Sequence, residues 1–278
     1  MRRRRLKRKP NRAGANALDM AVAARDRDVV AMVQRAVAHR EVMLAYQPVV
    51  TAGPGGGIAF YEGLIRVLDD TGRVIPARDF ITQIESMETG RDIDCLALEL
   101  GLQALTEVPD LRLSINMSAR SIGYGRWMQT LRRGLARDET AGERLILEIT
   151  ETSALTVPEL IGGFMRELQA EGIAFALDDF GAGYTAFRYF RDYSFDIVKI
   201  DGQFIRKVAT DRANQVITTA MVHIARHFDM LVVAETVENQ EDAAYLASIG
   251  VDCLQGYYFG APTLTPPWTD GTRHRAQG

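Results

Sequence analysis

Two adjacent aspartates, Asp178 and Asp179, end the apolar run FALDD and precede the glycine-rich FGAGYT. Successive strand side chains point to opposite faces of a sheet, so a continuing strand would bury one unpaired carboxylate at high cost. The pair therefore predicts that the strand ends there and that both carboxylates reach one point, as a divalent cation requires. Read alone, these residues are explained equally well by a cap or turn before a helix.

Polar side chains also stand at the ends of the other predicted strands: Gln47, Glu62, Asn116, Glu148, Lys199, Asp201, Glu235 and Gln255. Several carboxylates with one lysine among them repel one another unless cations neutralise the cluster. Oxygen ligands, without cysteine or histidine at any strand end, favour Mg²⁺ or Mn²⁺ over zinc. More carboxylates than one ion needs suggest two ions, the arrangement used in phosphodiester hydrolysis.

Eight short β-rich runs must position these residues, at 43–50, 58–65, 111–118, 144–150, 173–178, 195–200, 230–235 and 251–258. Most are separated by helical periodicity, most clearly at 92–105, 157–172 and 214–228. This alternation predicts an α/β fold, either a closed (β/α)₈ TIM-like barrel or an open doubly wound sheet. Only TAGPGGG, residues 51–57, joins the first two runs, which is too short for a crossover helix. The first strand is therefore expected to run antiparallel to the second.

The composition is that of an ordinary globular protein, with 278 residues, 47% hydrophobic and 25% charged. Two cysteines, Cys95 and Cys253, are too few for a disulfide framework in a chain of this length and favour a reducing compartment. No apolar stretch reaches the roughly 18 residues of a membrane span. The expected location is the cytoplasm.

The first ten residues hold seven of the 33 basic residues, and removing those charges from the formal net charge of −3 leaves −10. Residues 1–20 are therefore expected to be a basic, disordered arm, for which nucleic acid or an anionic membrane surface is a possible partner. Residues 21–265 are expected to form the catalytic domain and residues 266–278 a loose tail.

Seven motifs carry a family resemblance: YEGLIR (61–66), INMS (115–118), LEITET (147–152), DDFGAGYT (178–185), DIVKIDGQFI (196–205), AETVEN (234–239) and QGYYFGAP (255–262). Together, and in this order, they resemble the EAL family of cyclic-di-GMP phosphodiesterases over roughly residues 25–263. The resemblance implies a barrel with an antiparallel first strand that uses two divalent cations, Mg²⁺ or Mn²⁺, to hydrolyse cyclic di-GMP to linear pGpG.

The resemblance also assigns roles. Glu62, Asn116, Glu148 and Asp178 are implied ligands of one metal, and Asp178 and Asp179 of the second. Glu235 is implied near the second metal as a candidate general base, and Lys199 is implied to position the attacking water. The residues implied to contact or frame the dinucleotide are Gln47, Leu64, Arg66, Asp201, Glu238, Gln255 and Pro262.

The same resemblance implies that Glu151 holds the loop of residues 180–185, which shapes a homodimer contact in active members. Gly181 and Gly183 are expected to let this loop turn. One departure is Gly63, where the family has alanine, and glycine is expected to loosen the strand end without removing a ligand. The alternative to an enzyme is a catalytically silent cyclic-di-GMP receptor that acts through a protein partner.

Overall fold

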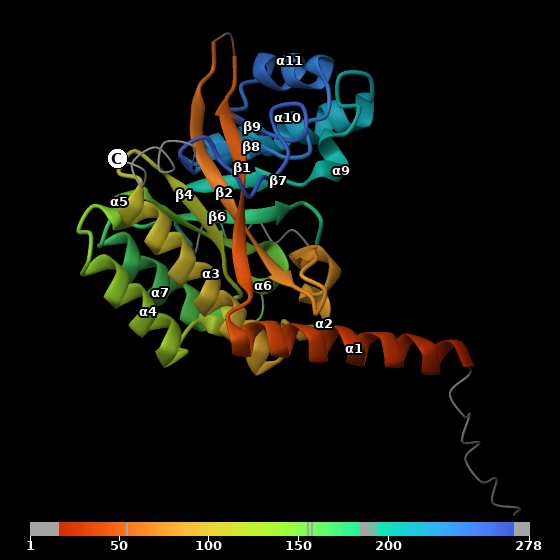
Figure 1. The fold of residues 1–278 in the computed structure, drawn as a ribbon. Helices are drawn as coiled ribbons and strands as arrows, with labels where there is room; N and C mark the ends of the chain where they lie inside the picture. The colour runs from red at the N-terminus through yellow and green to blue at the C-terminus, as the bar shows by residue number, and fades with distance from the viewer. Residues whose placement is uncertain are drawn as a thin grey trace, which may run out of the picture.

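Eight strands close into a barrel in the computed structural model, which describes residues 17–53, 55–154, 156, 158–183, 190 and 193–269, with side chains from residue 25 onward. The strand order is β1-β9-β8-β7-β6-β5-β4-β2, with β3 added beside β2, and pairing of β1 with β2 closes the ring. This pairing confirms the closed barrel and excludes the open doubly wound sheet. Figure 1 shows the helices on the outside of the ring.

The strands lie close to their predicted positions. Their bounds are β1 Val42–Thr51, β2 Ile58–Leu68, β3 Val74–Pro76, β4 Leu113–Asn116, β5 Leu145–Thr150, β6 Ala174–Phe180, β7 Ile197–Ile200, β8 Leu231–Ala234 and β9 Cys253–Gln255. Strand β1 is antiparallel to both neighbours, β2 and β9, as the short 51–57 connection predicts. Strand β3 was not predicted, because three residues carry too little periodicity to recognise.

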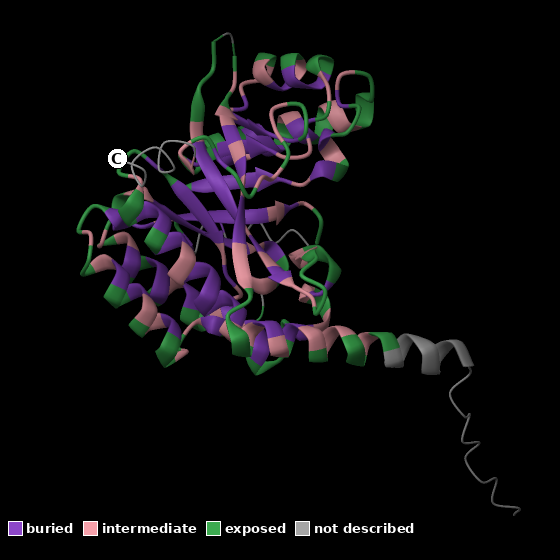
Figure 2. Ribbon diagram, in the orientation of Figure 1, coloured by how far each residue is buried: buried purple, intermediate pink, exposed green. Residues whose placement is uncertain are grey.

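The described α-helices are α1 Ala17–His39, α2 Ile81–Ile84, α3 Glu88–Glu107, α4 Gly125–Leu135, α5 Ala141–Arg144, α6 Glu151–Ala154, α7 Pro158–Gln169, α9 Gly202–Ile205, α10 Arg212–His227 and α11 Gln240–Ser248. Side-chain caps start several of them; for example, Asp211 accepts hydrogen bonds from the backbone N–H groups of Ala213 and Asn214 at the start of α10. The main core lies between these helices and the outer face of the barrel, where Figure 2 shows buried residues.

A second, smaller core fills the inside of the barrel. It contains one buried residue from each of seven strands: Val49, Phe60, Ile146, Ala176, Ile197, Val233 and Cys253. Strand side chains on one face recur every two residues. The positions two residues toward the opening of the barrel therefore face the same interior, and these positions hold most of the predicted strand-end residues.

The two ends of the described chain differ, because the C-terminal end packs on the barrel and the N-terminal end does not. Helix α1 begins at Ala17, and Figure 1 shows its N-terminal part projecting beyond the barrel. The ring of Trp268 packs edge-on against Tyr46 and Tyr61, so the first residues of the expected tail contact the barrel. Residues 1–16 and 270–278 lie outside the described residues. None of the described helices has both the length and the apolar character of a membrane span.

Candidate active site

The predicted strand-end residues meet at one mouth of the barrel. Glu62, Glu148, Asp178, Lys199, Glu235 and Gln255 each lie two residues beyond a member of the small interior core. Gln47 lies two residues before Val49, as expected for a strand that runs in the opposite direction. The apolar layer lies directly beneath these polar groups and forms the floor of the mouth. Because side chains alternate with a period of two along a strand, all of these polar side chains point into the barrel.

Lys199 lies at the centre of the mouth and is completely buried. Its Nζ lies 2.7 Å from a carboxylate oxygen of both Glu148 and Glu235. Glu62 at 3.3 Å and Asp178 at 3.2 Å complete the group around it. One ammonium therefore faces four carboxylates, which leaves this cluster with an excess of negative charge.

Side-chain amides complete the floor of the mouth. Asn116 Nδ2 donates to Glu62 Oε1 at 2.8 Å, and Gln255 Nε2 donates to Glu62 Oε2 at 2.6 Å. Gln255 Nε2 also lies within hydrogen-bond distance of Gln47 Oε1, at 3.2 Å. These donors fix the orientation of the Glu62 carboxylate without contributing charge.

Burial and mutual repulsion perturb the carboxyl groups. Burial raises the pKa of Glu148 to about 8, with a further rise from Glu62 and an opposing effect of Lys199. Burial likewise raises the pKa of Glu235 well above its usual value against the effect of Lys199. For Glu62, burial is outweighed by Lys199 and by the amide donors, and the pKa is lowered. Some of these carboxyl groups therefore carry protons near neutral pH unless bound cations replace the protons.

The donor set fits hard divalent cations. Ligand oxygens of Asp178, Asp179 and Glu235 lie within 4.8 Å of one another. Burial, followed by the charge of Asp178, raises the pKa of Asp179 to about 6. In addition, Glu148 Oε1 is buried and has no hydrogen-bond partner among the described residues. Closely spaced carboxylate oxygens, one of them without a partner, are the ligands that Mg²⁺ and Mn²⁺ prefer.

The prediction that β6 ends at the aspartate pair was wrong. Strand β6 continues to Phe180, with a shift in its pairing to β7 between Leu177 and Phe180. Asp179 has φ 56°, in the left-handed region. The strand is therefore irregular at Asp179, where the sequence predicted that it would end. The interruption turns Asp179 away from strand alternation, while Phe180 returns to pair with Ile200 and is buried.

The glycines of this loop differ from one another. Gly181 has φ 94°, whereas Gly183 is not among the positive-φ glycines. A β-carbon at Gly181 would also lie 2.6 Å from the ring of Phe204. The Gly181 N–H donates to Glu151 Oε2 at 3.1 Å, the contact expected of a glutamate that holds this loop. Residues 184 and 185 lie outside the described residues.

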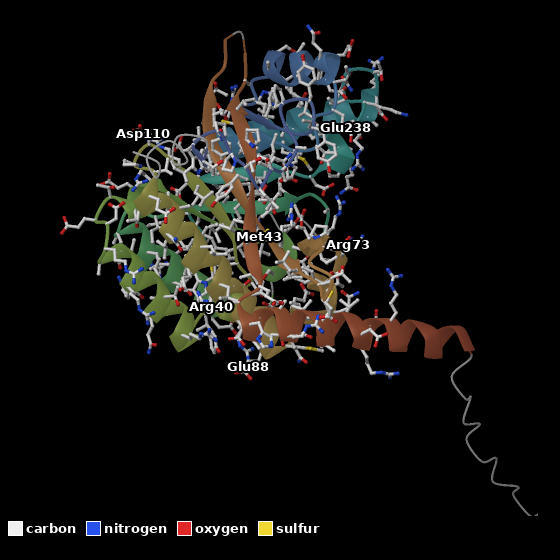
Figure 3. The ribbon with its side chains drawn as sticks, in the orientation of Figure 1. Arg40, Met43, Arg73, Glu88, Asp110 and Glu238 are labelled. Atoms are coloured by element: carbon white, nitrogen blue, oxygen red, sulfur yellow. The ribbon has the colours of Figure 1, made fainter. Side chains whose placement is uncertain are left out.

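Two hollows flank the carboxylate cluster. Hollow A, of about 490 Å³, is lined by Leu64, Ile93, Asp94, Met117, Thr152 and Asp179, among others. Hollow B, of about 290 Å³, is lined by Gln47, Arg78, Arg206, Thr236, Glu238 and Tyr257, among others. Glu62 and Leu64 border both hollows. Figure 3 shows Glu238 among the C-terminal elements, far from Arg40 and Glu88 beside α1.

The seven residues predicted to contact a dinucleotide fall into two groups. Gln47, Leu64, Glu238 and Gln255 line the hollows. The other three lie outside the described lining of both. Arg66 donates to the carbonyls of Leu64 and Ile65, Asp201 caps α9 through the N–H of Gln203, and Pro262 precedes Thr263, which pairs with Tyr46.

Sequence reasoning missed several lining residues. Thr236 and Tyr257 lie within the motifs AETVEN and QGYYFGAP, one and two residues after the strand-end residues Glu235 and Gln255, so their position near the mouth was a usable signal. Arg78 and Arg206 gave none, because the segments that carry them reach the site only through the fold. Asp94 lies inside the apolar face of α3 and lines hollow A, where it accepts hydrogen bonds from Ser118 N–H and Ser121 Oγ.

Comparison with known proteins is consistent with this geometry. The family model described as EAL domain matches residues 30–262. PdeF of Escherichia coli strain K12, a cyclic di-GMP phosphodiesterase, is 33% identical over 243 residues, which are 85% of this chain and 32% of PdeF. MucR of Pseudomonas aeruginosa, a bifunctional diguanylate cyclase and cyclic di-GMP phosphodiesterase, is 29% identical over 241 residues, 82% of this chain and 34% of MucR. The chain thus spans about a third of the length of these relatives.

Solved structures match the barrel itself. The PaMucR phosphodiesterase in complex with c-di-GMP superposes with a TM-score of 0.78 at 27% identity, covering 87% of this chain and 99% of that one. The FimX EAL domain from Pseudomonas aeruginosa bound to c-di-GMP superposes with a TM-score of 0.78 at 23% identity, covering 86% and 97% of the two chains. At that identity, FimX supports the fold alone.

Proposed function

The chain belongs to the EAL domain family, and from that premise we propose that it hydrolyses cyclic di-GMP to linear pGpG with two divalent cations, Mg²⁺ or Mn²⁺. The observation that carries the proposal is the cluster at the barrel mouth. Four carboxylates there surround one buried lysine, and three carboxyl groups have oxygens within 4.8 Å of one another. Such a surplus of oxygen ligands suits a pair of cations.

The proposed ligands divide between two positions. Glu62, Asn116, Glu148 and Asp178 would hold one cation, and Asp178, Asp179 and Glu235 the other. Bound there, the cations would lower the pKa of the attacking water and neutralise charge on the phosphate. Asp178 is the one residue proposed for both sets.

Lys199 would position the attacking water, and Glu235 would deprotonate it. The ammonium of Lys199 would orient it or a phosphate oxygen, and the carboxyl of Glu235, 2.7 Å from Lys199, would accept its proton. For this role Glu235 must be deprotonated. The raised pKa of its carboxyl opposes this state, and the positive charge of the bound cations would favour it. Hollows A and B open on either side of this point, and we assign one half of the cyclic dinucleotide to each.

The binding residues are proposed on the same basis. Gln47, Leu64, Glu238 and Gln255 would contact the nucleotide in the hollows, and Arg66, Asp201 and Pro262 would frame it. Glu151 would keep the loop after β6 in place through Gly181. Truncation of that contact by Glu151→Ala should lower kcat more than it weakens nucleotide binding, because Glu151 is placed to act through the loop.

The test is a chromatographic assay of purified protein with cyclic di-GMP and Mg²⁺ or Mn²⁺, with EDTA as the metal-free control. A metal-dependent pGpG peak is expected from the wild type, and a loss of at least about a hundredfold from Glu62→Gln. Glu159→Gln, on the exposed start of α7, is the matched control and should retain full activity. Full turnover by Glu62→Gln would contradict the ligand assignment. Tight binding of intact nucleotide without product would support the receptor alternative.

A further inference from the structure

Thr236, the residue after Glu235, has an unusual backbone conformation. Its φ is 56°, in the left-handed region. Glycine, asparagine and aspartate visit this region readily, whereas a β-branched residue there is an outlier held in place by its surroundings. The surroundings of Thr236 should therefore show what holds it.

The side chain of Thr236 packs against the backbone of Gly202, at the start of α9. A β-carbon on Gly202 would lie 2.6 Å from Cβ of Thr236 and 3.2 Å from its Cγ2, and closer still to Oγ1. Gly202 is buried and follows Asp201, which caps α9 directly after β7. The two residues thus interlock the ends of β7 and β8, and only glycine at position 202 leaves room for the threonine.

Hydrogen bonds on both sides of Thr236 show what the interlock controls. The Glu235 N–H donates to Ile200 O of β7 at 3.2 Å, and the Val237 N–H donates to Gln255 O of β9 at 2.9 Å. The chain must turn between these bonds, and Thr236 makes the turn. The same turn leaves the Glu235 carboxylate 2.7 Å from Lys199 Nζ and within reach of Asp178 and Asp179.

We infer that Thr236 is a positioning residue, whose left-handed backbone and packing on Gly202 fix the Glu235 carboxylate within the group of Asp178, Asp179 and Lys199. Its effect on turnover rests on the proposed function. Its effect on divalent-cation binding and on folding does not. A glycine at position 236 would allow the same turn but would free Glu235, because it removes the packing on Gly202.

The first test is Thr236→Gly, measured by steady-state kinetics with cyclic di-GMP, Mn²⁺ titration calorimetry and urea denaturation. We expect kcat to fall at least about tenfold with KM within about threefold, because Glu235 acts on the reaction rather than on nucleotide binding. The dissociation constant for Mn²⁺ should rise at least about tenfold. The urea midpoint should not fall, because the strained conformation is relieved.

Two further variants separate positioning from general disruption. Thr236→Asn keeps a β-carbon and a polar side chain of comparable size to pack on Gly202 and tolerates the left-handed region, so it should retain most of kcat and of the Mn²⁺ affinity. Asp229→Gly replaces an exposed residue of the same φ, 57°, just before β8. This matched control should leave kcat and Mn²⁺ affinity unchanged.

A reciprocal pair tests the interlock directly. Gly202→Ala places a β-carbon against Thr236 and should lower kcat, Mn²⁺ affinity and the urea midpoint. Thr236→Gly added to Gly202→Ala should restore the midpoint and bring kcat back to the level of Thr236→Gly alone.

Wild-type kcat and Mn²⁺ affinity in Thr236→Gly would overturn the inference, as would full tolerance of Gly202→Ala. If the wild type yields no pGpG, the proposed function fails. The inference then stands or falls on Mn²⁺ affinity and on the urea midpoints.

Discussion

Lys199 is the residue on which the electrostatics of the barrel mouth depend. Burial alone would lower the pKa of its ammonium, but Asp178, Glu148, Glu235 and Glu62 together raise it well above the usual value. The lysine is therefore charged at all ordinary pH values. Its removal would leave several buried carboxylates without a positive partner, a situation that costs about 3–5 kcal/mol when a buried pair is broken.

Substitution of Lys199 by methionine, which has a similar length, should therefore destabilise the fold most strongly in EDTA. We expect the free energy of unfolding to fall by about 3 kcal/mol or more in EDTA, and by less in Mn²⁺, because cations would neutralise the same carboxylates. Hydrolysis should fall by at least about a hundredfold. Urea denaturation with and without Mn²⁺ measures the first effect. Lys207→Met, at an exposed lysine, is the control, and equal losses in EDTA and Mn²⁺ would argue against cation binding here.

Asp94 makes the free energy of unfolding depend on pH. Burial raises its pKa to about 7, against the lowering effect of hydrogen bonds from Ser121 and Ser118. Between about pH 4 and pH 7, the folded state thus holds a proton that the unfolded state has lost. The contribution of Asp94 is therefore most favourable below about pH 4, falls as pH rises to about 7 and is constant above that value.

We expect Asp94→Asn to flatten this part of the stability profile. The wild type should lose stability relative to the variant as pH rises from about 4 to 7, by an amount on the order of 4 kcal/mol. Urea denaturation of both proteins at half-unit pH steps measures the difference. Parallel profiles across this range would show that Asp94 titrates normally in the folded protein.

At the scale of elements, Gly63 of β2 packs against β4, and it also lines hollow A. Strand alternation turns it to the outer face, opposite to Glu62. A β-carbon there would lie 2.7 Å from Cδ1 of Ile115, which is 1% exposed. The expectation that glycine loosens this strand end did not take Ile115 into account, whose side chain fills the space beside Gly63. The side chain of Ile115 occupies the place of the alanine that the family has.

This packing predicts a specific rescue. Gly63→Ala should cost about 1–3 kcal/mol through overpacking, and Ile115→Val, which removes Cδ1, about 0.5–1.5 kcal/mol. The double variant should be more stable than the sum of the two losses predicts, because the next atoms lie at 3.3 and 3.4 Å.

The control for this rescue is Gly101→Ala on α3. Its β-carbon would lie 2.8 Å from Cδ1 and 2.9 Å from Cγ1 of the same isoleucine. Because valine keeps Cγ1, Ile115→Val should rescue Gly101→Ala poorly. Additive losses for Gly63→Ala with Ile115→Val, by urea denaturation, would reject the proposed contact.

At the scale of the whole molecule, the antiparallel β1 closes the ring between β2 and β9 and brings Gln47 to the same mouth as the other strand ends. The basic segment, residues 1–10, falls outside the described residues. We propose that it provides a separate contact with an anionic partner, and that the barrels associate as homodimers, which sedimentation at several protein concentrations would test.

Removal of residues 1–10 should separate the two activities. We expect hydrolysis of cyclic di-GMP to remain within about twofold, because the barrel is intact. If the partner is nucleic acid, binding to a random DNA duplex should fall steeply with salt in the full chain and be lost in the truncated one. Fluorescence anisotropy across a salt series measures this. Salt-insensitive binding, or equal binding by both chains, would end the nucleic-acid proposal, and vesicles with anionic lipid test the other surface.

The amino-acid sequence by itself determined the order of strands and helices, the antiparallel β1 and the polar residues at the strand ends. These features are local, since they depend on period-two alternation, on a connection too short for a helix and on motif residues such as Glu62 and Asp178. The residues of the small interior core can also be predicted from the sequence, because an apolar residue stands two positions before most proposed ligands, as Ile146 does before Glu148.

Only the tertiary structure decided how these residues meet. Asp179 adopts its left-handed backbone because Phe180 must return to pair with β7, and Gly63 is filled by Ile115 from a neighbouring strand. Thr236 and Gly202 likewise interlock across 34 positions of sequence. In each case the physical cause is a contact between separate elements, and local patterning carries no record of which side chain a neighbouring element will place there.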